Sequence, residues 1–248
     1  MKILARFQAI SDNDKAALIR KLMEHSTPDF DFFYIVGLSI SMATLGLLLD
    51  SVSVVIGSML IAPIMYPILG VSLGLVMSHD SVLGRSFSTL VKSLATGLVV
   101  ATVIAFFFGD VGTYQTSEVI SRIHPDHLYF IVALIAGAAV SFALARPEWS
   151  ETLPGIAISV ALIPPLATAG IGIAYLDASV IKGASVLLLL NLLGIVTAAA
   201  ASFMMMNLYQ KKNIAESTIR RENERLQEEN NFIEAIEKGN GIGEHHEA

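Results

Sequence analysis

The sequence predicts an all-α, polytopic membrane protein with six transmembrane helices arranged as a 3+3 inverted repeat, followed by a cytoplasmic C-terminal helix. The 248 residues are 54% hydrophobic and 15% charged, with a mean hydropathy of +0.64. Soluble domains carry about 25% charged residues. Six long segments are apolar and free of charge. The first three of these segments resemble the last three in their small residues and prolines.

The composition excludes a water-soluble enzyme domain. A soluble globule of 248 residues has too much surface to hide a hydrophobic fraction of 54%. The net charge of −6 gives none of the basic excess that is typical of nucleic-acid binding. Because the chain has no cysteine, it has no disulfide, no thiolate metal site and no cysteine nucleophile. We therefore expect membrane lipid around the protein and no nucleic acid as a partner.

Each of the six apolar segments is long enough to predict a membrane-spanning helix. A spanning helix needs about 20 predominantly apolar residues. The segments are 32–49, 51–78, 93–109, 128–145, 152–176 and 183–210. They are continuously apolar rather than alternating, which favours helices over a transmembrane barrel. The first segment follows a mixed, polar start, so we expect it to act as its own uncleaved anchor.

Lysine and arginine near the spans predict the orientation of the chain. With six spans, both termini lie on one side, and that side holds 14 basic residues against 2 on the other, Arg122 and Lys182. This asymmetry predicts a multi-pass protein of the cell (inner) membrane with both termini in the cytoplasm. The predicted parts are a cytoplasmic N-terminal segment (1–28), a six-helix membrane domain (29–208, with repeat halves 29–109 and 128–208) and a cytoplasmic helical tail (209–248).

Matching residues recur between the two halves at a nearly constant spacing. The offset is 100 between the first and fourth spans, 98 between the second and fifth, and 97 between the third and sixth. Because each half has three spans, the second copy is inverted, an arrangement typical of secondary transporters. Chance matches are the alternative, since small residues are common in membrane helices. The matched pairs include Gly37 with Gly137, Ser41 with Ser141, Pro67 with Pro165, Gly74 with Gly172, and Arg85 with Lys182.

Prolines near the middle of the second and fifth spans predict two broken helices. Proline removes a backbone donor and clashes with the carbonyl four residues earlier. The freed carbonyls must face protein, a bound ion or a watery cavity, because lipid cannot satisfy them. Breaks in corresponding spans of two inverted halves indicate a binding site at the membrane midplane. The predicted substrate-binding residues are Ser58, Pro63, Tyr66, Pro67, Gly70, Ser159, Pro164, Pro165, Thr168, Gly170 and Asn191.

Each of these residues also has a purely structural interpretation. The prolines can be kinks that help six helices to pack, and the glycines can be points of close helix contact. No Asp, Glu, Arg or His falls inside a predicted span. Proton coupling through a buried carboxylate is therefore disfavoured, and helix ends and backbone carbonyls remain as the means of binding an ion or polar solute.

Enzyme chemistry has little support in the sequence. The compact His and acid groups, at 79–80 and 124–127, lie in loops on opposite sides of the membrane. The chain carries no zinc motif, no phosphate-binding loop and no Ser-His-Asp set. We therefore expect no catalytic residue, no metal site and no cofactor.

The two ends of the chain predict cytoplasmic helices. Ser11 begins a helix whose apolar stripe is formed by Leu18, Ile19, Leu22 and Met23. In the tail, Ile219, Leu226 and Ile233 recur every seven residues, with Asn223 and Asn230 before the last two. This pattern indicates a short coiled coil and a homo-oligomer through residues 209–237. A solvated helix extending the sixth span is the alternative.

The sequence around the prolines resembles that of the domain of unknown function 389 family, a group of hydrophobic membrane proteins. The first matching stretch runs from Gly57 through Pro63 and Pro67 to Gly74. The second runs from 155 to 172 and includes the two adjacent prolines of the fifth span. The similarity covers about residues 30–207. It implies a membrane location, no settled activity and no catalytic residues, and many relatives carry a larger soluble N-terminal domain.

The sequence thus predicts a transporter or channel for an unidentified small solute or ion, with its site at the proline- and glycine-containing second and fifth spans. The alternative is a membrane scaffold or sensor that does not transport and that acts through its cytoplasmic helix.

Overall fold

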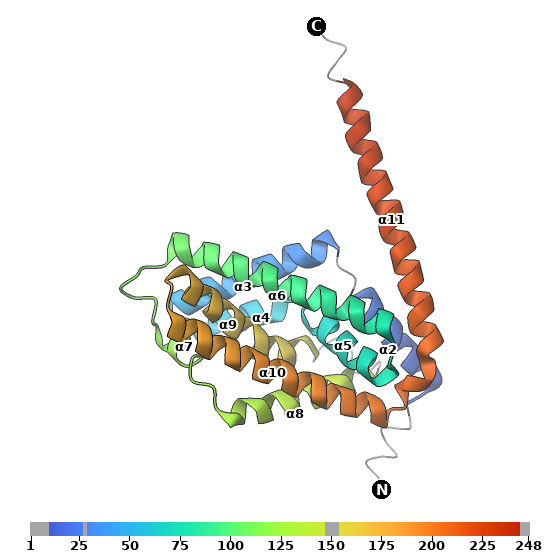
Figure 1. The fold of residues 1–248 in the computed structure, drawn as a ribbon, viewed down its shortest axis with the longest axis horizontal. Coiled ribbons are helices and arrows are strands. Elements are labelled where there is room, and N and C mark those ends of the chain that lie inside the picture. The colour runs from blue at the N-terminus through green and yellow to red at the C-terminus, as the bar shows by residue number, and fades with distance from the viewer. Residues whose placement is uncertain (1–9, 27–28, 147–153, 244–248) are drawn as a thin grey trace.

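The computed structural model describes residues 10–26, 29–146 and 154–243, which form helices and no strand. Side chains at 154–161, 210–212, 234–235 and 237–243 lie outside this description. The all-helical prediction is confirmed for the described residues (Figure 1). The elements are α2 (Asp12–Glu24), α3 (Phe30–Leu48), α4 (Val52–Ile61), α5 (Met65–Met77), α6 (Asp80–Phe108), α7 (Ser117–Ile120), α8 (His127–Leu144), α9 (Pro154–Ala174), α10 (Ala178–Met205), the 3-10 helix η1 (Leu208–Lys211) and α11 (Lys212–Gly243).

The helices make this chain a membrane protein. Four described helices, α3, α6, α8 and α10, are long and apolar enough to cross a membrane. The pair α4 and α5 passes the same test as a fifth span, bent by 56°. α9 adds a shorter apolar stretch, Leu162–Ala174. Large apolar side chains cover the outside of the bundle, such as Phe106, Phe107 and Phe108 at 69–72% exposure, as expected of a surface that faces lipid.

The helices that carry the prolines and glycines lie at the centre of the bundle. Every side chain from 67 to 74 in α5 and from 162 to 172 in α9 is buried. A helix that is apolar on all sides is buried either in protein or in a membrane. α9 packs against α3, α4, α5, α6, α8 and α10, and α5 packs mainly against α6 and α10. The peripheral helices therefore shield these two segments from lipid.

Only one of the two predicted helix breaks is present. Ala62, directly before Pro63, has an extended backbone with ψ of 124°, and α4 ends there. Proline disfavours helical geometry in the residue before it, which explains the break. The predicted break in the fifth span is wrong, because α9 continues as one helix with Pro164 and Pro165 inside it. Packing against six neighbouring helices holds α9 together despite the two missing donors.

The turns that follow α5 and α9 have the same geometry. Ser78 and Leu176 both adopt the left-handed conformation, with φ of 48° and 55°. After α5, the Ser78 amide donates to the Leu75 carbonyl and the His79 amide to the Gly74 carbonyl, both at 3.2 Å. This pair of bonds is a Schellman motif. After α9, the amide of residue 176 donates to the carbonyl of residue 173 at 3.2 Å, and the amide of 177 to the carbonyl of 172 at 2.9 Å. Each of these four residues is 98 positions after its counterpart at the end of α5.

Two further contacts recur between corresponding helices. A Cβ on Gly74 would lie 2.7 Å from the Leu83 backbone, and one on Gly172 would lie 2.9 Å from the Ile181 amide nitrogen. The first helices of the two halves share a side-chain bond as well. The Ser41 hydroxyl donates to the Gly37 carbonyl at 2.8 Å. The Ser141 hydroxyl donates to the Gly137 carbonyl at the same distance. Both Gly74 and Gly172 therefore let the next helix approach closely.

The helix predicted at the N-terminal end is confirmed. The Ser11 side chain caps α2 by accepting a hydrogen bond from the Asp14 amide at 3.1 Å. The predicted apolar stripe is buried, as α2 packs against α5 and α11. The four stripe residues are Leu18, Ile19, Leu22 and Met23.

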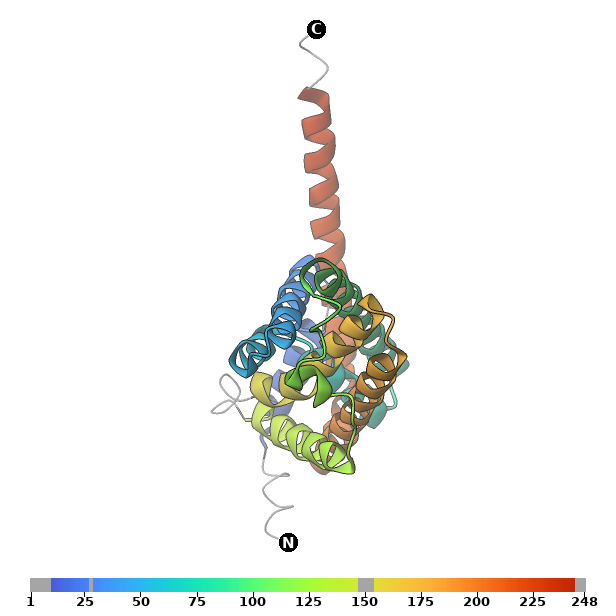
Figure 2. The same ribbon diagram turned by 90° about the vertical axis from the view of Figure 1, so that its left-hand side faces the viewer.

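α11 starts at the end of the bundle that carries α2 and then runs crosswise, far beyond the bundle (Figures 1 and 2). Its first half is anchored to other helices. Arg85 donates to Asn223, Arg225 lies 3.9 Å from Asp29, and His79 lies 3.6 Å from a Glu216 carboxylate oxygen. Asn223 is thus bonded within the chain. Among the described side chains of α11, those that make these polar contacts with other helices all lie before residue 226. The part of the predicted coiled coil that makes none of them begins at residue 226.

Candidate functional site

Two hollows approach the centre of the bundle from its opposite ends. The larger, named here the α8 hollow, has a volume of about 320 Å³ and begins beside α7. It reaches Pro164 and Pro165 in the middle of α9, and Asn191 in α10. It therefore contains three of the predicted site residues. Among the described side chains, its lining is Ile56, Met59, Ser121, Arg122, Tyr129, Val132, Pro164, Pro165, Leu187 and Asn191.

The smaller hollow, named here the α3 hollow, has a volume of about 190 Å³ and begins at the opposite end, beside α2. It reaches the break between α4 and α5. Two more predicted residues, Pro63 and Tyr66, belong to it. The structure therefore divides the predicted site residues between two hollows. The lining of the α3 hollow is Glu24, His25, Asp29, Asp31, Phe32, Ile35, Pro63 and Tyr66.

The two hollows occupy matching positions in the two halves of the sequence. Asp29 and Phe32 in the α3 hollow are each 100 residues before Tyr129 and Val132 in the α8 hollow. The α5 residue Tyr66 is 98 residues before Pro164. These are the same offsets that relate the first to the fourth span and the second to the fifth. In both hollows the segment just before α3 or α8 forms the wall at the bundle end.

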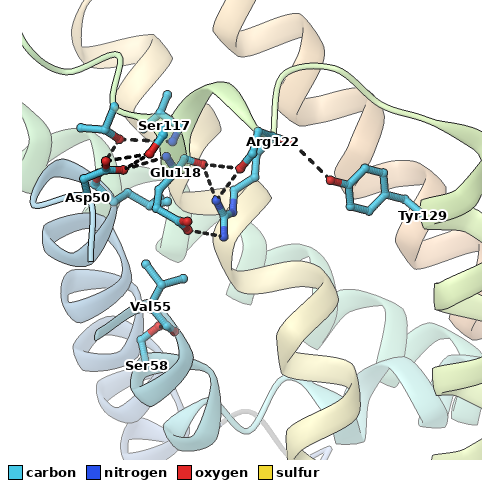
Figure 3. Close-up of polar contacts among 11 residues, drawn as sticks. Asp50, Val55, Ser58, Ser117, Glu118, Arg122 and Tyr129 are labelled. Carbon is cyan, nitrogen blue, oxygen red and sulfur yellow. Dashed lines mark hydrogen bonds and ion pairs between the residues drawn. The ribbon is translucent and has the colours of Figure 1, made fainter. Parts of the chain in front are cut away.

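Arg122, which lines the outer end of the α8 hollow, forms an ion pair with Glu118 of α7 (Figure 3). Arg122 Nη2 is 2.8 Å from Glu118 Oε2, and the two side chains are only 17% and 15% exposed. The other guanidinium nitrogen donates to the Ser121 hydroxyl at 2.9 Å and to the Glu118 carbonyl. The Tyr129 hydroxyl donates to the Ser121 carbonyl at 3.4 Å. The mouth therefore carries both signs of charge and no net charge from this pair.

Asp50 fixes the segment that carries this ion pair. Its carboxylate accepts from the Ser117 hydroxyl at 2.7 and 2.8 Å and from the Glu118 amide at 2.9 Å. The Ser117 bond, followed by the Glu118 bond, holds the pKa of Asp50 below its usual value. The Thr116 hydroxyl donates to the Leu47 carbonyl at 2.7 Å. α7 is thereby tied to the end of α3, which positions Arg122 over the hollow.

A second carboxylate at the same end orders the start of α10. Asp177 accepts from the Ser179 amide at 2.9 Å and from the Ser179 hydroxyl at 2.6 Å. It also accepts from the Tyr114 hydroxyl at 2.8 Å. These bonds, led by that of the Ser179 side chain, hold the pKa of Asp177 well below its usual range. The loop after α6 is thus fastened to α10.

The α3 hollow is lined by acidic groups and an aromatic stack. The His25 ring stacks on Tyr66 with 4.5 Å between ring centres. Burial, followed by the charge of Lys21, lowers the pKa of His25. Asp29 accepts from the Phe32 amide at 2.9 Å and so caps α3. Among the residues with described positions, no three His, Asp or Glu side chains are arranged to hold a metal ion.

The remaining predicted residues whose side chains are described lie outside both hollows. Ser58 is buried and donates to the Val55 carbonyl at 2.6 Å, while the Ser39 hydroxyl donates to the Ser58 carbonyl at 2.7 Å. The buried Thr168 hydroxyl has no hydrogen-bond partner in the described part of the chain. Pro67 is buried in the first turn of α5, where a missing amide hydrogen costs little. Ser159 lies among the side chains outside the description.

Gly70 and Gly170 are points of close helix contact. A Cβ on Gly70 would collide with the Ser86 side chain of α6, and one on Gly170 would collide with Ala101, also of α6. Such contacts are how small residues let membrane helices approach each other. For these two glycines the structure supports the packing interpretation over a direct binding role.

Sequence reasoning missed Asp50, Ser117, Glu118 and Arg122 as candidate site residues. One signal was present, because Arg122 is one of the two basic residues on its predicted side of the membrane. The spacing between Asp50 and Ser117 carries no local pattern, and only the folded chain brings them together.

Comparisons with known proteins identify a family and no activity. A model of the family described as domain of unknown function (DUF389) matches residues 59–197. "Uncharacterized protein MJ0678" of Methanocaldococcus jannaschii is 32% identical over 168 residues, which cover 67% of this chain and 51% of that protein. The chain therefore spans about half the length of this curated relative. No solved structure matches. Since the family model covers more than half of the sequence, including α5, α9 and most of the lining of the α8 hollow, the chain belongs to the DUF389 family.

Proposed function

We propose that this protein moves a small solute or ion across the membrane, using the α3 hollow and the α8 hollow as entrances from its two sides. The observation that carries the proposal is that the two hollows lie at opposite ends of the bundle and have corresponding linings. Each hollow also reaches the proline-containing region of a central helix. A carrier that exposes a central region to one side and then to the other needs such a pair of entrances.

The proposal includes a 3+3 inverted repeat, with α3 to α6 as one half and α8 to α10 as the other. It is supported by the glycine contacts at an offset of 98, and the Schellman turns and Ser–carbonyl bonds at offsets of 98 and 100, which other helices of the bundle also have, agree with it. The packing pattern has a counterpart as well: α6 packs on α9, and α10 packs on α5. An exchange of partners of this kind is expected where two inverted halves interlock.

The chemistry between the hollows favours a solute held by hydroxyls, amides and backbone groups. The central stretches of α5 and α9, from 67 to 74 and from 162 to 172, contain no ionisable side chain. Asn191, Thr168 and Ser58 supply the buried polar atoms nearby. Proton transfer through a buried carboxylate is therefore not part of the proposal, and neither is enzymatic catalysis.

The proposed orientation places both termini in the cytoplasm of a cell whose inner membrane holds the bundle. The excess of lysine and arginine on the side of the termini supports it. The α3 hollow, with its three carboxylates, then faces the cytoplasm. The α8 hollow, with its Arg122–Glu118 pair, faces the opposite side.

Thiol labelling can test this proposal directly. The sequence contains no cysteine, so an introduced cysteine supplies the single thiol of each variant. Ile35→Cys reports on the α3 hollow and Tyr129→Cys on the α8 hollow. In sealed, oriented vesicles, a membrane-impermeant thiol reagent is expected to label each variant from one side only, and the two sides are expected to differ. Leu38→Cys, whose side chain is 50% exposed on α3 outside either hollow, is the control.

Flux measurement completes this test. Purified protein in liposomes is assayed with a panel of ions, small metabolites and phospholipids, and Val132→Trp, which fills the α8 hollow, is the matched variant. We expect the wild type to conduct at least one solute and Val132→Trp to slow it. Labelling of both hollows from the same side, or a panel without any flux or binding, would refute the proposal.

A membrane scaffold or sensor is the second candidate, favoured by the projection of α11 beyond the bundle (Figure 2). It predicts that removal of residues 226–248 abolishes the biological effect of the gene, while Val132→Trp leaves that effect intact. The transport proposal predicts the reverse for the same pair of variants. A homo-oligomer through residues 209–237 belongs to this second candidate, and size measurement of the truncated protein tests it.

A further inference from the structure

The α8 hollow opens through the side of the bundle. Three residues that line it, Ile56 of α4 and Tyr129 and Val132 of α8, are also 49%, 38% and 55% exposed on the outer surface. A hollow that opened only at the bundle end would have its side walls covered by neighbouring helices. Here the walls are themselves part of the surface that faces the bilayer.

The surface around this opening is apolar. Leu60 of α4 is 55% exposed, and Ile131 and Ile135 of α8 are 46% and 65% exposed. In a spanning bundle such a surface contacts lipid chains. A molecule that reaches the α8 hollow from the side therefore comes out of the hydrocarbon layer, and at least part of it must be apolar.

The polarity of the hollow changes along its length. At the bundle end it is lined by Ser121, Arg122 and Tyr129, residue types that lie well at the membrane–water interface. Farther in, the lining is formed by Met59, Val132 and Leu187, with the α9 prolines at the inner end. Because those prolines lie near the middle of α9, the hollow extends over about one leaflet of a bilayer.

We propose that the α8 hollow binds an amphipathic lipid, with its head group at Ser121, Arg122 and Tyr129 and one hydrocarbon chain between α4 and α8. The inference deepens the proposed function, on which it rests for the lipid's role as a transported substrate. Binding itself does not depend on transport.

The ion pair at the mouth defines the class of head group. Arg122 and Glu118 are 2.8 Å apart and largely shielded from solvent. An anionic head group would have to displace Glu118 from Arg122, which leaves a shielded carboxylate without its partner. A zwitterionic head group presents phosphate to Arg122 and ammonium to Glu118 and keeps both charges paired. The lipid is therefore a zwitterionic phospholipid rather than an anionic one.

The first experiment asks from which phase the hollow is reached. Leu187→Cys places a single thiol inside it, and Leu189→Cys places one on the 56%-exposed outer face of α10. Both are treated in liposomes with a long-chain N-alkyl maleimide dissolved in the bilayer, and separately with a water-soluble sulfonate thiol reagent. We expect the alkyl reagent to label both thiols and the sulfonate reagent to label neither at a comparable rate.

Val132→Trp, added to Leu187→Cys, blocks the side opening. It is expected to slow alkyl labelling by roughly tenfold, the effect of about 1.4 kcal/mol of added steric cost. The same tryptophan in the Leu189→Cys protein is expected to leave labelling unchanged, which shows that its effect is confined to the hollow. Faster labelling of Leu187→Cys by the sulfonate reagent, or no alkyl labelling of it beside a reactive Leu189→Cys, overturns the inference and leaves the flux test of the proposed function untouched.

The second experiment identifies the head group. Wild-type protein is extracted from vesicles of equal parts phosphatidylethanolamine and phosphatidylglycerol, and the retained lipid is determined by native mass spectrometry. We expect retained phosphatidylethanolamine, several-fold less of it with Val132→Trp, and no change with Val103→Trp, a 46%-exposed position on α6 away from the hollow. Preferential retention of phosphatidylglycerol, or equal loss in both variants, overturns the assignment.

Discussion

Ser78 and Leu176 end the two central helices with the same left-handed backbone, at φ of 48° and 55°. They are 98 residues apart in the chain, and the same set of hydrogen bonds surrounds each. A non-glycine residue in this region of φ and ψ is strained, because its Cβ crowds the backbone. Two unrelated side chains therefore tolerate the same strain at corresponding turns, which indicates that the turn geometry is imposed by the helix packing on both sides.

Replacement of these residues by glycine is expected to stabilise the protein. Ser78→Gly and Leu176→Gly each relieve the left-handed strain and are expected to gain about 1 kcal/mol. Thermal unfolding in detergent measures the change. Leu75→Gly, inside α5, is the control and is expected to lower the stability. A loss of stability in both turn variants would contradict the assigned conformation.

Added methyl groups at the paired glycines are expected to be harmful. Gly74→Ala and Gly172→Ala place a Cβ 2.7 and 2.9 Å from the backbone of the following helix. Overpacking of this kind costs about 1–3 kcal/mol. Gly84→Ala is the control, because no atom lies within 4 Å of its added Cβ. The control should keep or raise the unfolding temperature, since alanine favours helix more than glycine does.

The bonds to Asp50 predict a defined pH dependence. Its pKa is lowered in the folded protein, so these bonds stabilise the fold at pH values above the ordinary value of 3.8. That stabilisation is lost as the pH falls through the lowered pKa. Ser117→Ala removes the largest cause, and the pKa of Asp50 should rise toward 3.8, as followed by NMR titration of labelled aspartate carboxyls. An unchanged titration would mean that the Ser117 bond is absent in solution.

The Arg122–Glu118 pair is expected to show strong coupling. Glu118→Gln and Arg122→Gln each leave a shielded charge without its partner, so each should lower the unfolding temperature. The double variant should lower it by less than the sum of the two single effects. The double-mutant cycle measures this coupling. The exposed pair Arg220–Glu224 of α11, whose side chains are 83% and 58% exposed, is the comparison and should give a much smaller coupling.

Local sequence patterns predicted the elements whose cause is local. Ser11 caps α2 as expected, and Pro63 ends α4 because its effect falls on the residue before it. The two adjacent prolines in α9 follow the same local rule and yet remain helical. Their outcome depends on six surrounding helices, which a pattern in one segment does not describe.

The candidate site was predicted in part for the same reason. Pro63, Tyr66, Pro164, Pro165 and Asn191 do line hollows, because irregular or polar groups in a membrane must face protein or a cavity. The division of these residues between two hollows depends on how helices that are far apart in the chain pack together, which the sequence pattern does not show. The polar mouth of the α8 hollow depends on a bond between residues 50 and 117, which no periodicity reveals.

The break at Pro63 makes the two halves mechanically unequal. α4 and α5 are two short rods that meet at 56°, whereas α9 is a single rod of 21 residues. α5 can swing about the joint while α4 stays in place, but α9 must tilt as one lever. In the proposed transport cycle, we therefore expect the opening at one end of the bundle and the opening at the other to be different movements, with different rates and different energetic costs.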